Sequence, residues 1–224
     1  MKKTKLIALT LVVAVMIMGA GYASWTDLTQ INGTVTTGVL DIQVKDVSSR
    51  AHKYTTSNAT EIDDNTIKFE VGKLYPTVYN KNDKNTFGQL NFTIENEGNV
   101  PVKLDNVVFT PTDSTSELWQ HLGTAVSIDK VRVRDGIIDY ETRESLTGPT
   151  PIVGDLNELD TLIANSGLKN VVLNPDEALI FGYIGKDEID SYIGYYLKDS
   201  APNTTQNSTT GFTLTINWKQ ANID

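Results

Sequence analysis

Cysteine is absent from the sequence, and histidine occurs only twice in its 224 residues. Without cysteine the chain has neither disulfide bonds nor a thiol nucleophile. A zinc site of cysteine and histidine, which needs three or four such ligands, is nearly excluded as well. Positive charge is also scarce, with 19 Lys and Arg against 28 Asp and Glu and a net charge of −9. This balance argues against a basic groove, and we expect no nucleic-acid partner.

The motifs of common enzyme classes are missing too. The sequence contains no HExxH, no GxSxG, no Walker loop and no GxGxxG. His52 belongs to a polar loop and His121 to a short helix, so the two do not have the paired spacing of a metalloprotease helix. We therefore predict no catalytic residues, no cofactor and no enzymatic activity. A secreted metal-dependent peptidase remains as the alternative.

Two other groups of residues have both a functional and a structural interpretation. Acidic residues cluster at Asp63-Asp64 and at Asp187-Glu188-Asp190, and such carboxylates can bind calcium. Solvated loop charges are the preferred interpretation, because the spacing does not match an EF-hand loop. Trp119 and Tyr195-Tyr196 could form the aromatic platform of a glycan-binding adhesion module. Packing of these rings in the core is preferred here as well.

The first 23 residues have the anatomy of a secretory signal peptide. Positive residues 1–5 precede the apolar run Leu6–Met18, and small residues lead up to Ala23. We expect cleavage between Ala23 and Ser24 and a protein in the extracellular matrix or at the cell surface. The apolar run is shorter than the ~20 residues of a membrane span. An uncleaved anchor is the alternative, and it would be the only contact with a membrane.

The segment that follows the expected cleavage site is extended in character and rich in threonine. Its large apolar side chains are Trp25, Leu28, Ile31 and Val35. They can pack into the sheet of their own chain, or the segment can add as a strand to a neighbouring molecule, because an open sheet edge offers unpaired backbone groups. Both outcomes remain open from the residues alone.

Most of the remaining chain has an apolar period of two, which indicates strands with one buried face. The alternating runs are Leu40–Val44, Ile67–Val71, Leu90–Ile94, Val100–Phe109, Val126–Val133 with a bulge, Leu179–Tyr183 and Phe212–Trp218. So many short strands predict an antiparallel β-sandwich that occupies residues 24–224 as a single domain.

Short helical insertions are expected within this sandwich. One is predicted over 114–122 and ends at Gly123, and the other covers 155–164 with Gly167 just beyond it. Residues 187–198 fit either a helix or a strand. Polar composition predicts loops over 46–65, 76–86 and 199–210.

Three stretches of the sequence resemble one known family, the TasA/camelysin proteins. The first is Gly21–Asp27 (GYASWTD) with Asn32–Ile42 (NGTVTTGVLDI), the second Leu90–Val102 (LNFTIENEGNVPV), and the third Phe212–Asn222 (FTLTINWKQAN). The resemblance implies a jelly-roll-like β-sandwich and processing by a SipW-type signal peptidase. It also implies a role as a subunit of extracellular biofilm matrix fibres.

In fibres of this family, the N-terminal segment freed by cleavage is donated as a strand to the next subunit. By resemblance, that role falls to Ser24 through about Val35. Within this segment we expect the large apolar side chains of Trp25, Leu28 and Ile31 to be the anchors. We therefore expect a secreted structural subunit that polymerises head to tail, with copies of itself and accessory matrix proteins as partners. One branch of the family is described as metallopeptidases, but the sequence has no recognisable zinc motif.

Overall fold

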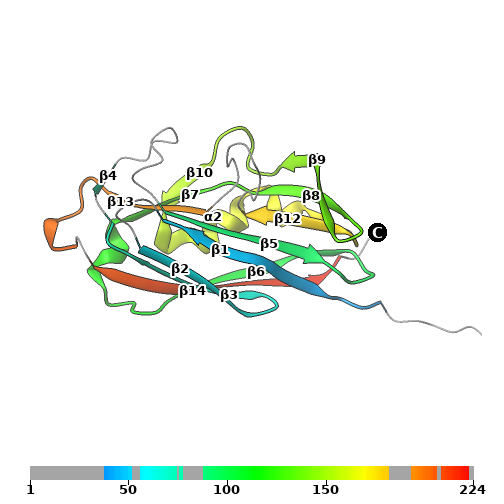
Figure 1. Ribbon diagram of the computed structural model, residues 1–224, viewed down its shortest axis with the longest axis horizontal. Helices are drawn as coiled ribbons and strands as arrows, with labels where there is room; N and C mark the ends of the chain where they lie inside the picture. The colour runs from blue at the N-terminus through cyan, green and yellow to red at the C-terminus, as the bar shows by residue number, and fades with distance from the viewer. Residues whose placement is uncertain are drawn as a thin grey trace, which may run out of the picture. The chain divides into compact units, whose positions relative to one another are not determined.

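The fold is built from extended segments whose apolar side chains alternate, so each strand turns one face inward. The computed structural model describes residues 38–51, 56–74, 76–77, 88–181, 193–205 and 208–221. The chain divides into the units Met1–Thr37 and Gly38–Asp224, and the described residues all belong to the second. Figure 1 shows the layered strands of this unit. The signal-peptide helix expected within 1–23 lies outside the described residues.

The larger sheet is centred on β5 (Gly88–Asn96), whose side chains are almost all buried. The described residues give it nine strands in the order β10-β7-β13-β5-β12-β8-β9, with β1 added to β5 and β4 added to β13. The strand pairs are antiparallel, except that β4 runs parallel to β13. The remaining bounds are β1 Ile42–Arg50, β4 Pro76–Thr77, β7 Leu122–Val126, β8 Asp129–Arg134, β9 Ile137–Ser145, β10 Ile152–Asp155, β12 Glu177–Phe181 and β13 Ile193–Lys198.

One edge of β5 carries two strands in succession. The other edge is occupied by β1, which pairs with β5 from Gln89 to Asn96. The two strands on the first edge are β12, which pairs with residues 92–95 of β5, and β13, which pairs with residues 88–90. The larger sheet therefore forks at β5, with β8 and β9 on one branch and β7 and β10 on the other.

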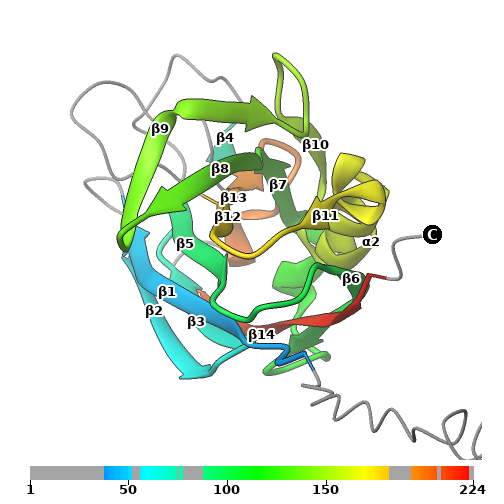
Figure 2. The ribbon, with the colours of Figure 1, turned by 90° about the vertical axis from the view of Figure 1, so that its right-hand side faces the viewer.

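The smaller sheet lies against the inner face of the larger one. Its order is β11-β6-β14-β3-β2, with bounds β2 Thr56–Asp63, β3 Thr66–Gly72, β6 Val102–Pro111, β11 Val172–Leu173 and β14 Thr209–Gln220. Figure 2 shows β1 of the larger sheet running beside β2 of the smaller one. The backbone N–H of Val44 donates to the carbonyl of Asp64 at 2.9 Å, which links the two sheets along this side.

The helical insertions are short. Three 3₁₀ turns, η1 (Glu117–His121), η2 (Leu156–Glu158) and η3 (Gly167–Asn170), accompany the helix α2 (Leu159–Asn165), and a fourth, η4, spans Asn203–Thr205. Helix α2 packs beside β6 and β10 and buries Leu159 and Ile163. All-β sandwich architecture with short helical insertions is thus confirmed.

Aromatic rings fill the space between the two sheets. The ring of Phe212 lies 5.2 Å from Phe69, 4.8 Å from Phe109 and 6.3 Å from Trp119, measured between ring centroids. These spacings fall in the range in which tilted and edge-on pairs attract each other. Phe212 is 1% exposed and joins β3, β6 and η1 to β14, so it is a hub of the core.

The loop predicted over 46–65 is wrong. Strand β1 continues to Arg50, and β2 occupies Thr56–Asp63 within it. β2 is an edge strand, and Asn58, Thr60 and the residues after it are exposed, so its sequence lacks the alternation of a half-buried strand. The loops over 76–86 and 199–210 are also too long, because Pro76–Thr77 form β4 and Thr209 begins β14.

Three other element predictions change as well. The single bulged strand over 126–133 is two strands, because β7 ends at Val126 and β8 begins at Asp129. The helix predicted over 114–122 is a 3₁₀ turn, and Gly123 belongs to β7 and does not end a helix. In the ambiguous stretch 187–198, the described residues from Ile193 form a strand.

We predict that Phe212→Ala lowers the free energy of unfolding by about 3–5 kcal/mol, because it opens a cavity at the centre of the aromatic cluster. Phe212→Leu keeps most of the volume and should cost less than about 1.5 kcal/mol. Urea unfolding followed by tryptophan fluorescence measures both. Equal losses for the two variants would contradict the role of Phe212 as a packing hub.

Candidate functional site

The residues predicted to act in cleavage and self-assembly lie outside the described part of the chain. These are Ala23, Ser24, Trp25, Leu28, Ile31 and Val35. The structure does describe Gly38 to Asp41, which begin three positions after Val35, and the place where these residues join the sandwich. It also describes a polar groove that the sequence did not suggest.

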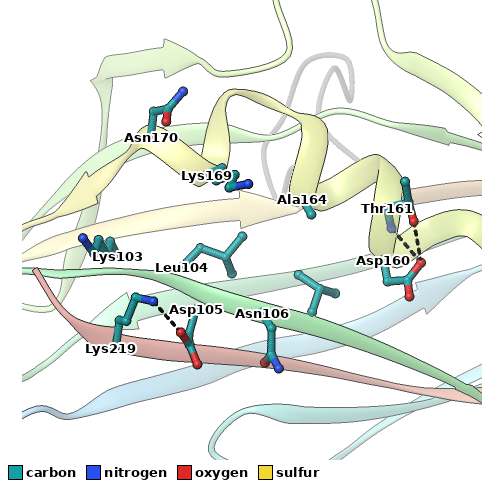
Figure 3. Close-up of a pocket in the computed structure, with 11 residues that line it drawn as sticks. Lys103, Leu104, Asp105, Asn106, Asp160, Thr161, Ala164, Lys169, Asn170 and Lys219 are labelled. Carbon is teal, nitrogen blue, oxygen red and sulfur yellow. Dashed lines mark hydrogen bonds and ion pairs between the residues drawn. The ribbon is translucent and has the colours of Figure 1, made fainter.

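The groove lies where β6 borders α2 and η3 (Figure 3). Its volume is about 430 Å³, and apolar side chains of Leu104, Val107 and Ala164 contribute to its lining. The charged and polar lining residues come from three regions that are distant in sequence, namely β6, the neighbouring elements α2 and η3, and β14. No local motif could have revealed it for this reason.

Residues 38–41 are held against the turn between β5 and β6. The backbone N–H groups of Glu97 and Gly98 both donate to the carbonyl of Asp41, at 2.9 and 3.0 Å. Asn99 donates from its backbone to the carbonyl of Val39 at 3.0 Å, and its side-chain Oδ1 accepts from the N–H of Val39 at 2.6 Å. We call these contacts the N-terminal clamp, because they fix the chain where it enters the sandwich.

Two glycines make this close approach possible. A Cβ on Gly98 would lie 2.4 Å from the carbonyl oxygen of Val39 and 2.7 Å from the backbone nitrogen of Asp41. A Cβ on Gly38 would lie 1.9 Å from a methyl carbon of Val100. A larger residue at Gly98 therefore requires the backbone of the clamp to shift, and one at Gly38 requires the Val100 side chain to move.

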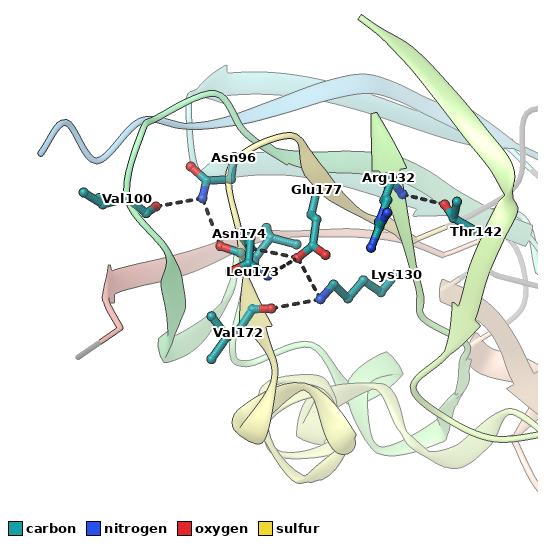
Figure 4. Close-up of polar contacts among 9 residues, drawn as sticks. All are labelled: Asn96, Val100, Lys130, Arg132, Thr142, Val172, Leu173, Asn174 and Glu177. Atoms are coloured by element: carbon teal, nitrogen blue, oxygen red, sulfur yellow. Dashed lines mark hydrogen bonds and ion pairs between the residues drawn. The ribbon is translucent and has the colours of Figure 1, made fainter. Parts of the chain in front are cut away.

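Asn96 connects the clamp to both sheets (Figure 4). Its side-chain Nδ2 donates to the carbonyl of Val100 in the turn and to the carbonyl of Leu173 in β11, each at 2.9 Å. Its Oδ1 accepts from the backbone N–H of Gly98 at 3.1 Å. The side chain is 1% exposed, so these bonds form away from water. One residue of β5 thus holds the turn and joins the larger sheet to the smaller one.

A half-buried ion pair supports the same region. Lys130 lies 2.7 Å from Glu177 and also donates to the carbonyl of Val172 at 3.0 Å. Glu177 in turn accepts from the backbone and side-chain nitrogens of Asn174 at 2.8 and 3.0 Å. Figure 4 shows this network next to the Asn96 bonds. It fixes the segment that presents Leu173 to Asn96.

Lys45 places a positive charge beside the turn. Its Nζ donates to Glu95 at 2.8 Å and also to Glu97. Burial alone would lower the pKa of Lys45, but the hydrogen bonds and charges of the two glutamates outweigh burial and raise this pKa above its usual 10.5. The ammonium therefore helps to hold β1, β5 and the turn together.

The residues considered for metal chemistry do not converge in the described part of the chain. Among the described residues, no three His, Asp or Glu side chains lie close enough to hold a metal ion. His121 ends η1, and Asp63 accepts a hydrogen bond from the backbone of Asn65 at 3.1 Å. His52 and the cluster at 187–190 lie outside the described residues.

The aromatic residues considered as a glycan platform are buried. Trp119, Tyr195 and Tyr196 are 5%, 1% and 9% exposed. The indole N–H of Trp119 donates to the carbonyl of Asp113 at 2.7 Å, and burial raises the pKa of Tyr195. Core packing, the preferred interpretation of these rings, is confirmed.

Comparisons with protein-family models, curated proteins and solved structures found no match for this chain. In the part of the chain that the structure describes, no helix has the length and apolar character to cross a bilayer.

We predict that Asn96→Ala lowers the free energy of unfolding by about 2–3 kcal/mol, because two carbonyls lose their donor in a buried site. Asn91→Ala is the matched control in the same strand. Its Oδ1 is buried without a partner among the described residues, so this change should cost less than about 1 kcal/mol. Thermal unfolding of both variants measures the difference, and equal costs would contradict the bridging role of Asn96.

The raised pKa of Lys45 predicts a loss of stability at alkaline pH. Because the folded-state pKa lies above the unfolded one, the stabilisation is complete below the unfolded value and is lost as pH rises through the folded value. Lys45→Met should cost only about 0.2–1 kcal/mol at pH 8, since the pair is partly exposed and screened by water. Urea titrations should show the wild type and the variant converging above pH 10.5. A gap that stays constant there would contradict the prediction.

Proposed function

We propose that this protein is a secreted structural subunit of extracellular biofilm matrix fibres. In this proposal the signal peptide 1–23 is removed, and residues 24–35 then add as a strand to a neighbouring copy. Copies joined head to tail in this way form heterologous contacts, which give filaments when the rotation does not close. The likeness of three sequence stretches to the TasA/camelysin family supports the same assignment.

The observation that carries the proposal is the N-terminal clamp. Residues 39–41 are tied to the turn at 97–99 by four hydrogen bonds from backbone N–H groups, so the chain enters the sandwich at a fixed point. Four large apolar side chains lie in the dozen residues shortly before this point. Because residues 39–41 are fixed, less conformational entropy is lost when the segment before them binds a partner in one orientation.

Open sheet edges give a donated strand a place to add. Among the described strands, β9 and β10 end the two branches of the larger sheet, and β2 ends one side of the smaller sheet. Each of these strands exposes an apolar side chain, namely Ile137, Val153 and Ile62, which are 71%, 49% and 55% exposed. Edge strands with unpaired backbone groups are the usual receptors for strand addition.

Deleting Ser24 through Ile31 tests the proposal directly. The truncated protein should remain a folded monomer with an unchanged circular dichroism spectrum, and it should form no fibres in negative-stain electron microscopy. Burial of each large apolar anchor contributes about 1.5–3 kcal/mol, so the combined change Trp25→Ala, Leu28→Ala and Ile31→Ala should also abolish fibres.

The matched control replaces three threonines of the same segment, Thr26, Thr29 and Thr34, with alanine. This variant keeps the apolar anchors and should still form fibres. Fibres of normal appearance from the deletion variant would overturn the proposal. Loss of fibres in the threonine variant alone would overturn the assignment of the anchors.

A further inference from the structure

The groove beside β6 has a charge that differs in sign from the rest of the chain. Lys103, Lys169 and Lys219 line it together with only two acids, Asp105 and Asp160, whereas the whole chain has a net charge of −9. The described part of the chain offers no carboxylate to Lys103 or Lys169 within ion-pair distance. Two ammonium groups are therefore available to an anion in the groove.

The positions of Lys103 and Lys219 lower the stability of the folded protein when no ligand is bound. Lys103 of β6 and Lys219 of β14 stand directly opposite each other in the sheet register. Like charges at opposite positions destabilise a strand pair. Lys219 relieves part of this cost by pairing with Asp105 at 2.6 Å, whereas Lys103 has no carboxylate partner among the described residues. An anion bound beside Lys103 would offset the remaining repulsion between Lys103 and Lys219.

The rest of the lining suits a ligand with several hydroxyl groups. Asp160 uses Oδ1 to accept from the backbone and hydroxyl of Thr161, at 2.6 and 3.3 Å, so its second oxygen can accept from a ligand. Asn106 accepts from Asn217 at 2.7 Å and keeps its own amide N–H groups as donors. Asn170 adds a further amide at the rim.

Positive charge and hydroxyl-binding groups lie at different ends of the groove. Figure 3 shows Lys103, Lys169 and Lys219 toward one end of the groove, and Asp160 with Thr161 at the other. The lining residues include no aromatic ring on which a nucleobase could stack. A volume of about 430 Å³ is in the range of small-molecule sites and accommodates a sugar unit or two.

We propose that this groove binds an acidic saccharide, with the carboxylate of a uronate unit near Lys103 and Lys169 and the sugar hydroxyls on Asp160 and Asn106. The assignment rests on the groove alone and does not depend on fibre formation. Attraction between the lysines and the carboxylate weakens with salt, because the site is open to solvent.

Titration of the full chain with trigalacturonate tests this, with binding followed by isothermal calorimetry at 20 and 200 mM salt. The wild type should bind one trigalacturonate saturably, and more weakly at high salt. The fully methyl-esterified trisaccharide, which lacks the charge, should bind at least tenfold more weakly. Lys103→Gln with Lys169→Gln should lower the affinity at least tenfold.

Two controls complete the experiment. Lys68→Gln removes the same charge from β3 of the same sheet, where Lys68 pairs with Glu70 at 2.9 Å, and it should leave binding unchanged. Protection of Lys103 and Lys169 from amine acylation by the trisaccharide gives a second readout that needs no variant. Absence of binding, equal binding by the double variant, or equally tight binding of inorganic phosphate would each overturn the proposal.

Discussion

Three hydrogen bonds of the buried Asn96 side chain connect the end of β5, the turn after it and strand β11. Asn96 ends β5, satisfies carbonyls in the turn and in β11, and orients the turn that receives residues 39–41. An asparagine suits this place because its amide supplies two donors and one acceptor within a single plane. Apolar packing gives the sandwich its core, whereas this amide links β5 to β11 of the smaller sheet and orients the turn that binds residues 39–41.

Much of the fold could be predicted from the sequence, and the failures have a common physical origin. The runs at 67–71, 90–94 and 212–218 alternate because one face of β3, β5 and β14 is buried, so the pattern and the structure agree. β2 and β9 were missed because both are edge strands whose side chains are mostly exposed, and solvent imposes no alternation on them. The fork at β5 is a tertiary feature that pairs β12 and β13 with one strand, and no local pattern encodes it.

The candidate site was predictable only in part. The Asn96-Glu97-Gly98 stretch could be recognised as a turn, but its contact with Leu173, 77 residues away, depends on the meeting of two sheets. Position 98 needs glycine because the backbone of Val39 and Asp41 passes close to it, and the sequence does not reveal this contact. The three lysines of the groove come from β6, η3 and β14, so their proximity appears only after folding. Whether Trp119 and Tyr195 are exposed also depends on tertiary packing, and the structure buries both rings in the core.

In the proposed assembly, residues 24–35 lie on a neighbouring copy. Photo-cross-linking in mixed assemblies measures this most directly. A photoreactive residue replaces Thr29, which lies between the proposed anchors, and equal amounts of ¹⁴N- and ¹⁵N-labelled protein are assembled together. The account predicts cross-linked peptide pairs that carry both isotopes, joined to an edge strand such as β2, β9 or β10. Cross-links confined to peptides of a single isotope would show that the segment packs on its own chain and would contradict the account.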